Sequence, residues 1–227
     1  VRSVYSPSRE VRLIQGRIVS RFLKNPAVIV WPRFIFGGIH RSALPAGDNR
    51  DHVACAARHC GARSLVKMDI RNYFDNVTLD MVVETMEVQL GWSQDAAGLL
   101  AQLCTRDGCL PQGGITSSYL ALLVLYDVEC QLVKNLGYKG LTYTRYVDDI
   151  TISSKIAHFD YDPVVKMVDQ LLLSKGLSIN SAKTLSRMSG LEPLVVHGLN
   201  VASSTPVLPK SEVKRIKAVS RQTVMDA

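Results

Sequence analysis

The chain has 227 residues, 47% of them hydrophobic, which is enough to bury a sizeable core in one domain, or in one domain with parts of its neighbours. The formal net charge of +7 favours a polyanionic partner such as nucleic acid. The longest apolar stretch, residues 119–126, is too short to span a bilayer, and no secretory signal is visible.

The cysteines argue against a covalent framework. There are five, an odd number, and none of them forms a Cys-x-x-Cys pair. This pattern favours reduced, mostly buried thiols over disulfides or a zinc site. We therefore expect a cytoplasmic protein with no membrane segment.

The N-terminal part predicts two helices separated by a loop. Residues 2–7 can form one extended strand. Apolar residues recur at helical spacing from Glu10 to Leu23, and arginines occupy the opposite face. Prolines and glycines make residues 31–49 a loop, and residues 51–60 predict a second helix.

From Leu65 onward, the order of the predicted elements is β-α-β-β-α-β. Leu65–Ile70 is a predicted buried strand, and Thr78 can cap a helix that runs to Leu90. The other predicted helices are residues 93–105, 116–136 and 161–175, and the other predicted β-runs are residues 141–147, 150–154, 177–179 and 194–201. Gly137 to Gly140 should end the second of these helices, and Gly176 the third. This order is a ferredoxin-like split unit, so we expect an α+β fold.

Two adjacent carboxylates lie at the turn of the predicted hairpin, in Tyr146-Val147-Asp148-Asp149. Charges this close repel one another unless a divalent cation lies beside them. Asp69, at the end of the predicted strand 65–70, can supply a third carboxylate. A solvated turn is the alternative for an Asp-Asp pair taken alone, so the other motifs must decide.

Three further motifs could contact a nucleotide. Phe74 follows Asp69 by five residues, where a flat ring beneath a sugar could exclude a 2′-hydroxyl; a core aromatic is the alternative. Pro111-Gln112-Gly113-Gly114 precedes a helix start, and its glycines allow the backbone to approach a ligand closely. Lys183 could meet a pyrophosphate leaving group, or simply lie on the surface.

These motifs resemble, in their order, motifs A to E of reverse transcriptases. The matching residues are Asp69 with Phe74, Pro111-Gln112-Gly113, Tyr146-Val147-Asp148-Asp149, Asn180 with Lys183-Thr184, and Gly198-Leu199. Residues 142–151 and 49–52 resemble the retron-type enzymes, within the bacterial group that includes group II intron enzymes. Val196-His197-Gly198 resembles the retron Val-Thr-Gly, with His197 in place of Thr.

The resemblance implies the palm of a right-handed polymerase. Residues 1–64 would be partial fingers, residues 65–205 the palm with inserted fingers elements, and residues 206–227 the start of a thumb. We expect the outer fingers and most of the thumb to lie outside this sequence.

The resemblance also implies RNA-directed DNA synthesis by two-metal nucleotidyl transfer. Two Mg²⁺ ions would be held by Asp69, Asp148, Asp149 and the Ile70 carbonyl. The incoming nucleotide would meet Phe74, Gln112 and Gly113, and its phosphates would meet Arg2 and Lys183.

The implied partners are a structured noncoding template RNA, the RNA–DNA duplex, dNTPs and an effector protein in anti-phage defence. One alternative is a group II intron-like reverse transcriptase, and another is a catalytically idle relative that serves as an RNA-binding scaffold. A palm-fold nucleotidyl cyclase would need a Gly-Gly-Asp/Glu-Asp/Glu-Phe type of hairpin, and Tyr146-Val147-Asp148-Asp149 is not of that type.

Overall fold

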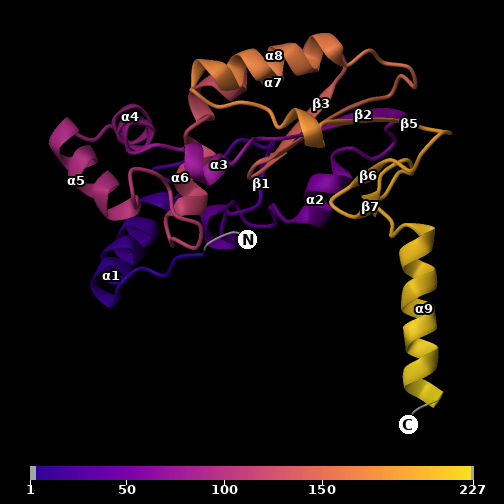
Figure 1. Ribbon diagram of the computed structural model, residues 1–227, viewed down its shortest axis with the longest axis horizontal. Coiled ribbons are helices and arrows are strands. Elements are labelled where there is room, and N and C mark those ends of the chain that lie inside the picture. Colours follow the sequence, from indigo (N-terminus) through magenta and orange to yellow (C-terminus); the bar gives the residue numbers. More distant parts are fainter. Residues whose placement is uncertain (1–3, 226–227) are drawn as a thin grey trace.

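The computed structural model describes residues 4–225, and a five-stranded sheet lies at its centre (Figure 1). The strands are β1 (Ile35–Phe36), β2 (Ser64–Asp69), β3 (Thr142–Tyr146), β4 (Asp149–Ser154) and β5 (Leu185–Met188). Their order is β1-β3-β4-β2-β5, in which β2 pairs antiparallel with both β4 and β5. The stretch β3-β4-β2-β5 has the strand order of a ferredoxin-like unit, so the predicted α+β fold is confirmed.

Helices flank this sheet on several sides (Figure 1). The longer ones are α1 (Arg9–Ile18), α4 (Leu79–Leu90), α5 (Gln94–Cys104), α7 (Tyr126–Tyr138), α8 (Asp162–Ser174) and α9 (Lys210–Met225). Helices α7 and α8 lie along one face of the sheet, and α2 (His52–Ala57) lies toward the other. Helices α1, α4 and α5 gather at one end, while α9 projects away from the body. Within residues 4–225, no helix is both long and apolar enough to cross a membrane.

Several helix starts lie where their capping residues predict. The Thr78 hydroxyl accepts a hydrogen bond from the Met81 N–H at 3.3 Å at the start of α4. The Ser93 hydroxyl does the same for Ala96 at the start of α5. Each contact satisfies one of the backbone donors that the first turn of a helix leaves unpaired.

The predicted helix over residues 10–23 is confirmed, with a change in its last turns. Helix α1 continues without a gap into a π-helical segment, η1 (Val19–Leu23). The predicted helix over residues 51–60 is shorter than expected. Asp51 caps α2, which ends at Ala57.

The predicted single helix over residues 116–136 is wrong. The chain forms α6 (Ser117–Leu123) and, after a break at Val124 and Leu125, α7. The apolar run favours helix throughout, but it cannot reveal which side chains elsewhere take up the carbonyls at the end of α6. The predicted helix end between Gly137 and Gly140 is confirmed, since α7 runs through Gly137 and ends at Tyr138.

The predicted last strand was also misplaced. Residues 177–179 contribute only an isolated bridge, between Ile179 and Ile70, and the strand that pairs with β2 is β5. The residues of β5 are mostly exposed, so its sequence lacks a buried alternating pattern. Residues 194–201 form a separate hairpin of β6 (Val195–Val196) and β7 (Leu199–Asn200).

The N-terminal predictions need two further corrections. The predicted loop over residues 31–49 contains β1, which pairs in parallel with β3, and the short 3₁₀ helix η2 (Arg41–Ala43). Residues 4–7 form no strand, although Tyr5 makes one backbone hydrogen bond. Arg2 lies outside the described residues.

A buried histidine, His59, follows α2 and links that segment to the hairpin of β3 and β4. The two ring nitrogens of His59 lie 2.7 Å from the Ser153 hydroxyl and 2.7 Å from the Thr144 hydroxyl. Burial lowers the pKa of His59 to about 3, so the ring is neutral at neutral pH. Both ring nitrogens are therefore satisfied without burying a charge.

Candidate functional site

A polar pocket of about 450 Å³ opens at the end of β2, beside the turn between β3 and β4. Its walls come from segments far apart in the sequence. The lining residues are Tyr5, Asp69, Ile70, Asn72, Tyr73, Phe74, Asp75, Gln112, Asp148, Asn180 and Lys183.

The strand register brings the three predicted carboxylates to one end of the sheet. Asp69 is the last residue of β2 and lies directly opposite Asp149, the first residue of β4. The Ile70 N–H donates to the Asp148 carbonyl at 3.0 Å, which ties the hairpin turn to the end of β2. Asp69 and Asp148 line the pocket, and Asp149 is half-buried beside it.

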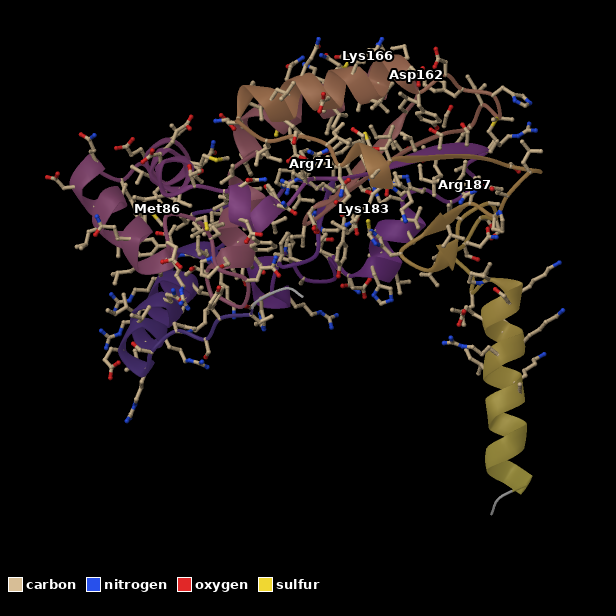
Figure 2. The ribbon with its side chains drawn as sticks, viewed as in Figure 1. Arg71, Met86, Asp162, Lys166, Lys183 and Arg187 are labelled. Carbon is tan, nitrogen blue, oxygen red and sulfur yellow. The ribbon has the colours of Figure 1, made fainter. Side chains whose placement is uncertain are left out.

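Two residues after α8 occupy both carboxylate oxygens of Asp69. Lys183, labelled in Figure 2, lies on the short 3₁₀ helix η3 (Ser181–Lys183). Its ammonium lies 3.0 Å from Oδ1 of Asp69. The Asn180 amide donates to Oδ2 at 3.2 Å, and the Asn180 N–H donates to the Asp69 carbonyl at 2.7 Å. The Asp69 side chain is thus held from two directions.

The electrostatics at this end of the sheet disfavour a second negative charge. Burial raises the pKa of Asp149, and the nearby Asp69 carboxylate raises it further, while Lys67 and Lys183 oppose the shift. Among the residues that the structure describes, no group of three acidic, histidine or cysteine side chains is close enough to hold a metal ion. The donors nevertheless suit a hard divalent cation, since carboxylates and a neighbouring carbonyl are the ligands that Mg²⁺ prefers.

The hairpin turn that carries Asp148 is strained. Val147 has a φ of +58°, a conformation that β-branched residues rarely adopt. The Val147 N–H donates to the Phe36 carbonyl of β1 at 3.2 Å, and the Val147 carbonyl accepts from Nη1 of Arg145 at 2.9 Å. Such strain persists only where the surroundings enforce it, and it is found preferentially at functional sites.

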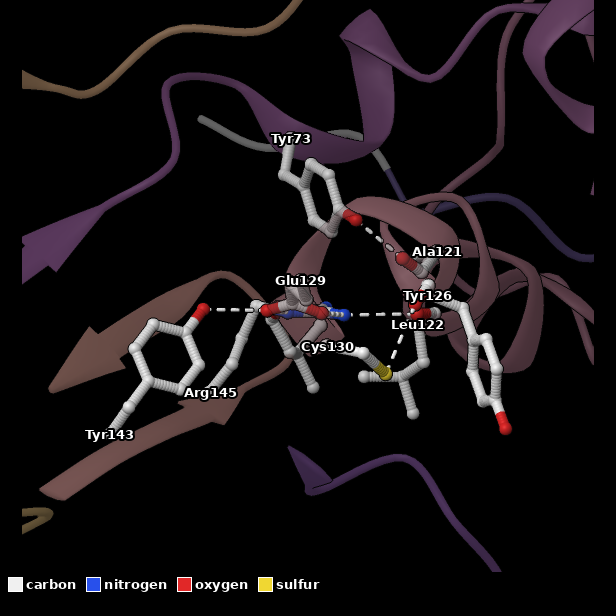
Figure 3. Close-up of polar contacts among 9 residues, drawn as sticks. Tyr73, Ala121, Leu122, Tyr126, Glu129, Cys130, Tyr143 and Arg145 are labelled. Atoms are coloured by element: carbon white, nitrogen blue, oxygen red, sulfur yellow. Dashed lines mark hydrogen bonds and ion pairs between the residues drawn. The ribbon is translucent and has the colours of Figure 1, made fainter. Parts of the chain in front are cut away.

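Arg145 is itself held by a fully buried network (Figure 3). Its guanidinium makes two hydrogen bonds of 2.6 Å to the two carboxylate oxygens of Glu129. The Tyr143 hydroxyl donates to the same carboxylate at 2.5 Å, and Nη2 of Arg145 also donates to the Leu122 carbonyl at 2.9 Å. Burial alone would lower the pKa of Arg145, but the Glu129 carboxylate raises it above its ordinary value.

Of the other predicted residues, Phe74 and Gln112 line the pocket, whereas Gly113 does not. Phe74 lines the pocket and makes an edge contact with Tyr73, with ring centroids 6.1 Å apart. Gln112 also lines the pocket. Gly113 is not among the lining residues, but it has a φ of +96° and lies against Tyr5, whose carbonyl a Cβ at Gly113 would approach to 2.6 Å.

Sequence reasoning did not assign several residues that the structure places in or behind the site. The motif that contains Asn180 gives this residue no role of its own, although it holds Asp69. Tyr5 and Glu129 offer no sequence signal, because their partners are distant in the chain. Asn72, with a φ of +44°, and Asp75 complete the pocket wall.

The chain matches the family model described as "Reverse transcriptase (RNA-dependent DNA polymerase)" over residues 6–192. It is 42% identical to the retron Ec48 reverse transcriptase of Escherichia coli, covering 96% of this chain and 53% of that protein. It is 30% identical to the retron Se72 reverse transcriptase of Salmonella heidelberg, covering 95% of this chain and 55% of that protein. The predicted resemblance to retron-type enzymes is confirmed, and the chain spans about half the length of these curated relatives.

Solved structures support the fold at low sequence identity. A telomerase from Candida albicans, in complex with a fragment of telomeric RNA, has a TM-score of 0.55 and 12% identity, covering 86% of this chain and 37% of that one. An apo telomerase from Candida tropicalis, truncated from its C-terminal domain, has a TM-score of 0.54 and 11% identity, covering 88% and 44%.

We predict that Glu129→Gln strongly destabilises the protein. The substitution leaves the buried Arg145 charge without its counter-ion, which should lower the free energy of unfolding by about 3–5 kcal/mol. Urea unfolding followed by circular dichroism measures this loss.

The matched control for this measurement is Glu84→Gln. Glu84 has an exposed side chain that pairs with the mostly buried Lys175 at 2.9 Å, and Lys175 keeps a second carboxylate partner in Asp127 at 3.0 Å. The loss of the Glu84 charge should therefore cost about 0–1 kcal/mol. Equal, small losses in the two variants would show that the buried pair does not hold the hairpin.

Proposed function

We propose that this chain, which belongs to the reverse transcriptase (RNA-dependent DNA polymerase) family, carries the nucleotidyl-transfer site of a retron-type RNA-directed DNA polymerase. The observation that supports this most directly is the register of β2 and β4, which sets Asp69 opposite Asp149 beside a pocket that Asp148 also lines. A polar pocket at paired carboxylates suits a polyphosphate substrate that binds with divalent cations.

The parts of a right-handed polymerase can be assigned on this basis. Residues 1–64 would be partial fingers, and residues 65–205 would be the palm with inserted fingers elements such as α4 and α5. Residues 206–227 would begin the thumb, a proposal supported by the way α9 leaves the body of the molecule.

Asp69, Asp148 and Asp149, with the Ile70 carbonyl, would hold two Mg²⁺ ions. Bound there, the ions would supply Lewis acidity and charge neutralisation for an in-line displacement at phosphorus. Asn180 would keep Asp69 oriented, as its two hydrogen bonds do in the structure. Lys183, freed from Asp69, would bring positive charge to the pyrophosphate leaving group.

The other lining residues would position the nucleotide. Phe74 would lie under the deoxyribose, and Gln112 and Gly113 would line the approach to it. Arg2, outside the described residues, would meet the triphosphate. Catalysis would then depend mainly on positioning and electrostatics rather than on protein nucleophiles.

The partners proposed for this site are a structured noncoding template RNA, the RNA–DNA duplex and dNTPs. The net charge of +7 supports contacts to a nucleic acid backbone. Exposed arginines on and just beyond α1, among them Arg9, Arg12, Arg17 and Arg21, could supply some of them. A role in anti-phage defence, with an effector protein, is a further proposal that rests on the retron-type relatives.

Asp148→Asn should abolish synthesis while leaving the fold intact, because it removes an anionic ligand and nearly keeps the shape of the side chain. Extension of a primed RNA template with Mg²⁺ should fall by at least about 100-fold, the scale for losing a group that stabilises charge in the transition state. Asp95→Asn, at an exposed position in the first turn of α5, should extend normally. Near-normal extension by a folded Asp148→Asn variant would overturn the assignment.

Phe74→Val should admit ribonucleotides. If the ring excludes the 2′-hydroxyl, the ratio of dNTP to rNTP incorporation efficiency should fall by about 10-fold or more. Phe159→Val, a change in a partly buried ring that packs on Tyr161, should leave that ratio unchanged. A lower melting temperature with an unaltered ratio in both variants would mean that Phe74 is only a core residue.

The retron assignment predicts a defined product in cells. Cells that express the intact protein together with its neighbouring noncoding locus should accumulate one short single-stranded DNA linked to RNA, and Asp148→Asn should remove it. Electrophoresis with and without RNase treatment, followed by sequencing, identifies the product. Long DNA copied from arbitrary templates would instead indicate a group II intron-like or general reverse transcriptase.

A further inference from the structure

We propose that Tyr5, backed by Arg106, is a stacking platform for a nucleobase in the polar pocket. This inference rests on the proposed polymerase function and deepens it by adding a specificity-determining residue. Tyr5 is a lining residue of the pocket that also holds Asp69, Phe74 and Asp148.

The backbone at Tyr5 is fixed against the loop that precedes α6. The Tyr5 N–H donates to the Gln112 carbonyl at 2.8 Å. Gly113 packs so closely that a Cβ there would lie 2.6 Å from the Tyr5 carbonyl and 2.8 Å from a methyl group of Val4. The ring of Tyr5 therefore enters the pocket from a defined position.

One face of the Tyr5 ring is covered by a cation. The guanidinium carbon of Arg106 lies 3.9 Å from the ring centroid, within the range of a cation–π contact. Arg106 is held in turn by two backbone hydrogen bonds with Cys109, at 2.8 and 3.1 Å, and by an ion pair with Asp107. The residue is not enclosed by this contact, since Tyr5 as a whole is 37% exposed and lines the pocket.

The other aromatic residues of the pocket are already engaged. Tyr73 is buried, and its hydroxyl donates to the Ala121 carbonyl. Phe74 packs against Tyr73 and the core, and the role proposed for it above is at the sugar rather than at the base. Among the described lining residues, Tyr5 is thus the aromatic ring that is both accessible and fixed, in a pocket whose remaining groups are mostly carboxylates, amides and an ammonium. Those polar groups suit phosphates and metal ions, whereas a π-face suits a base.

The test compares Tyr5→Ala, Tyr5→Phe and Arg106→Gln in single-nucleotide addition by the intact protein on a primed RNA template. Loss of one base–aromatic stack should raise the dNTP KM of Tyr5→Ala by about 5- to 100-fold, while kcat changes less than about 2-fold. Tyr5→Phe keeps the ring and should stay within about 3-fold of wild type, and Arg106→Gln should give an intermediate rise. The Kd for dNTP in a complex with a dideoxy-terminated primer should rise in parallel.

The base could belong to the incoming nucleotide or to the template, and the size of the base separates the two sources. If Tyr5 stacks on the incoming base, Tyr5→Ala should raise the KM more for dATP opposite uracil than for dTTP opposite adenine. If Tyr5 stacks on the template base, the order should reverse. An equal loss for every pair would mean that Tyr5 contacts sugar or phosphate, and would overturn the proposal.

The proposal also fails if Tyr5→Ala keeps the wild-type KM for dNTP, or if Tyr5→Phe raises this KM as much as Tyr5→Ala does. Should Tyr5→Ala not fold, Arg106→Gln decides: an unchanged KM in that variant would overturn the platform. Tyr138→Ala, at a 79% exposed tyrosine of α7, serves as the control and should change nothing. These comparisons require a wild-type protein that extends the primer and an Asp148→Asn variant that does not. Failure of the proposed polymerase function would therefore appear separately, as a wild-type protein that cannot extend.

Discussion

The buried ion pair between Arg145 and Glu129 is the contact on which the geometry of the site depends. A charge removed from water costs several kcal/mol unless a counter-ion and hydrogen bonds replace the solvent, and here they do. After its two bonds to Glu129 the guanidinium still has donors left, and Nη1 donates to the Val147 carbonyl while Nη2 also donates to the Leu122 carbonyl. A β-branched residue is thereby kept at positive φ, and Asp148 is presented at the pocket. Conformational strain at the turn is offset by a network in the core.

The same network explains why the apolar run after Thr116 is two helices. The last carbonyls of a helix lack intrahelical partners and need others. At the end of α6, the Leu122 carbonyl accepts from Arg145, and the Ala121 carbonyl accepts from the Tyr73 hydroxyl (Figure 3). The break then lets α7 set Glu129 against the hairpin. The break between α6 and α7 thus allows hydrogen bonds that link Tyr73, the β3–β4 hairpin and helix α7.

At the pocket the problem is a different one, because three carboxylates lie at one end of the sheet. The Asp69 carboxylate is met by an ammonium and an amide, and the pKa of Asp149 is raised by burial and by Asp69. A site in this state favours the arrival of cations. The charges behind the hairpin, on Arg145 and Glu129, are paired and fully buried, whereas the Lys183 side chain that meets Asp69 is 52% exposed.

The class of the fold, the hairpin with its paired carboxylates, and the helix starts at Thr78 and Ser93 could be predicted from the amino-acid order, because these follow from local periodicity, turn chemistry and capping. The sequence also supplied the motif order that identifies the family. Four features could not be predicted in this way: the break between α6 and α7, the exposed strand β5, the partner of Arg145 and the place of Tyr5 in the pocket. Each of these depends on groups distant in the chain, such as Glu129 with Arg145 or Tyr5 with Gln112, whose energies arise only when folding removes water between them. Local sequence patterns cannot predict such long-range contacts.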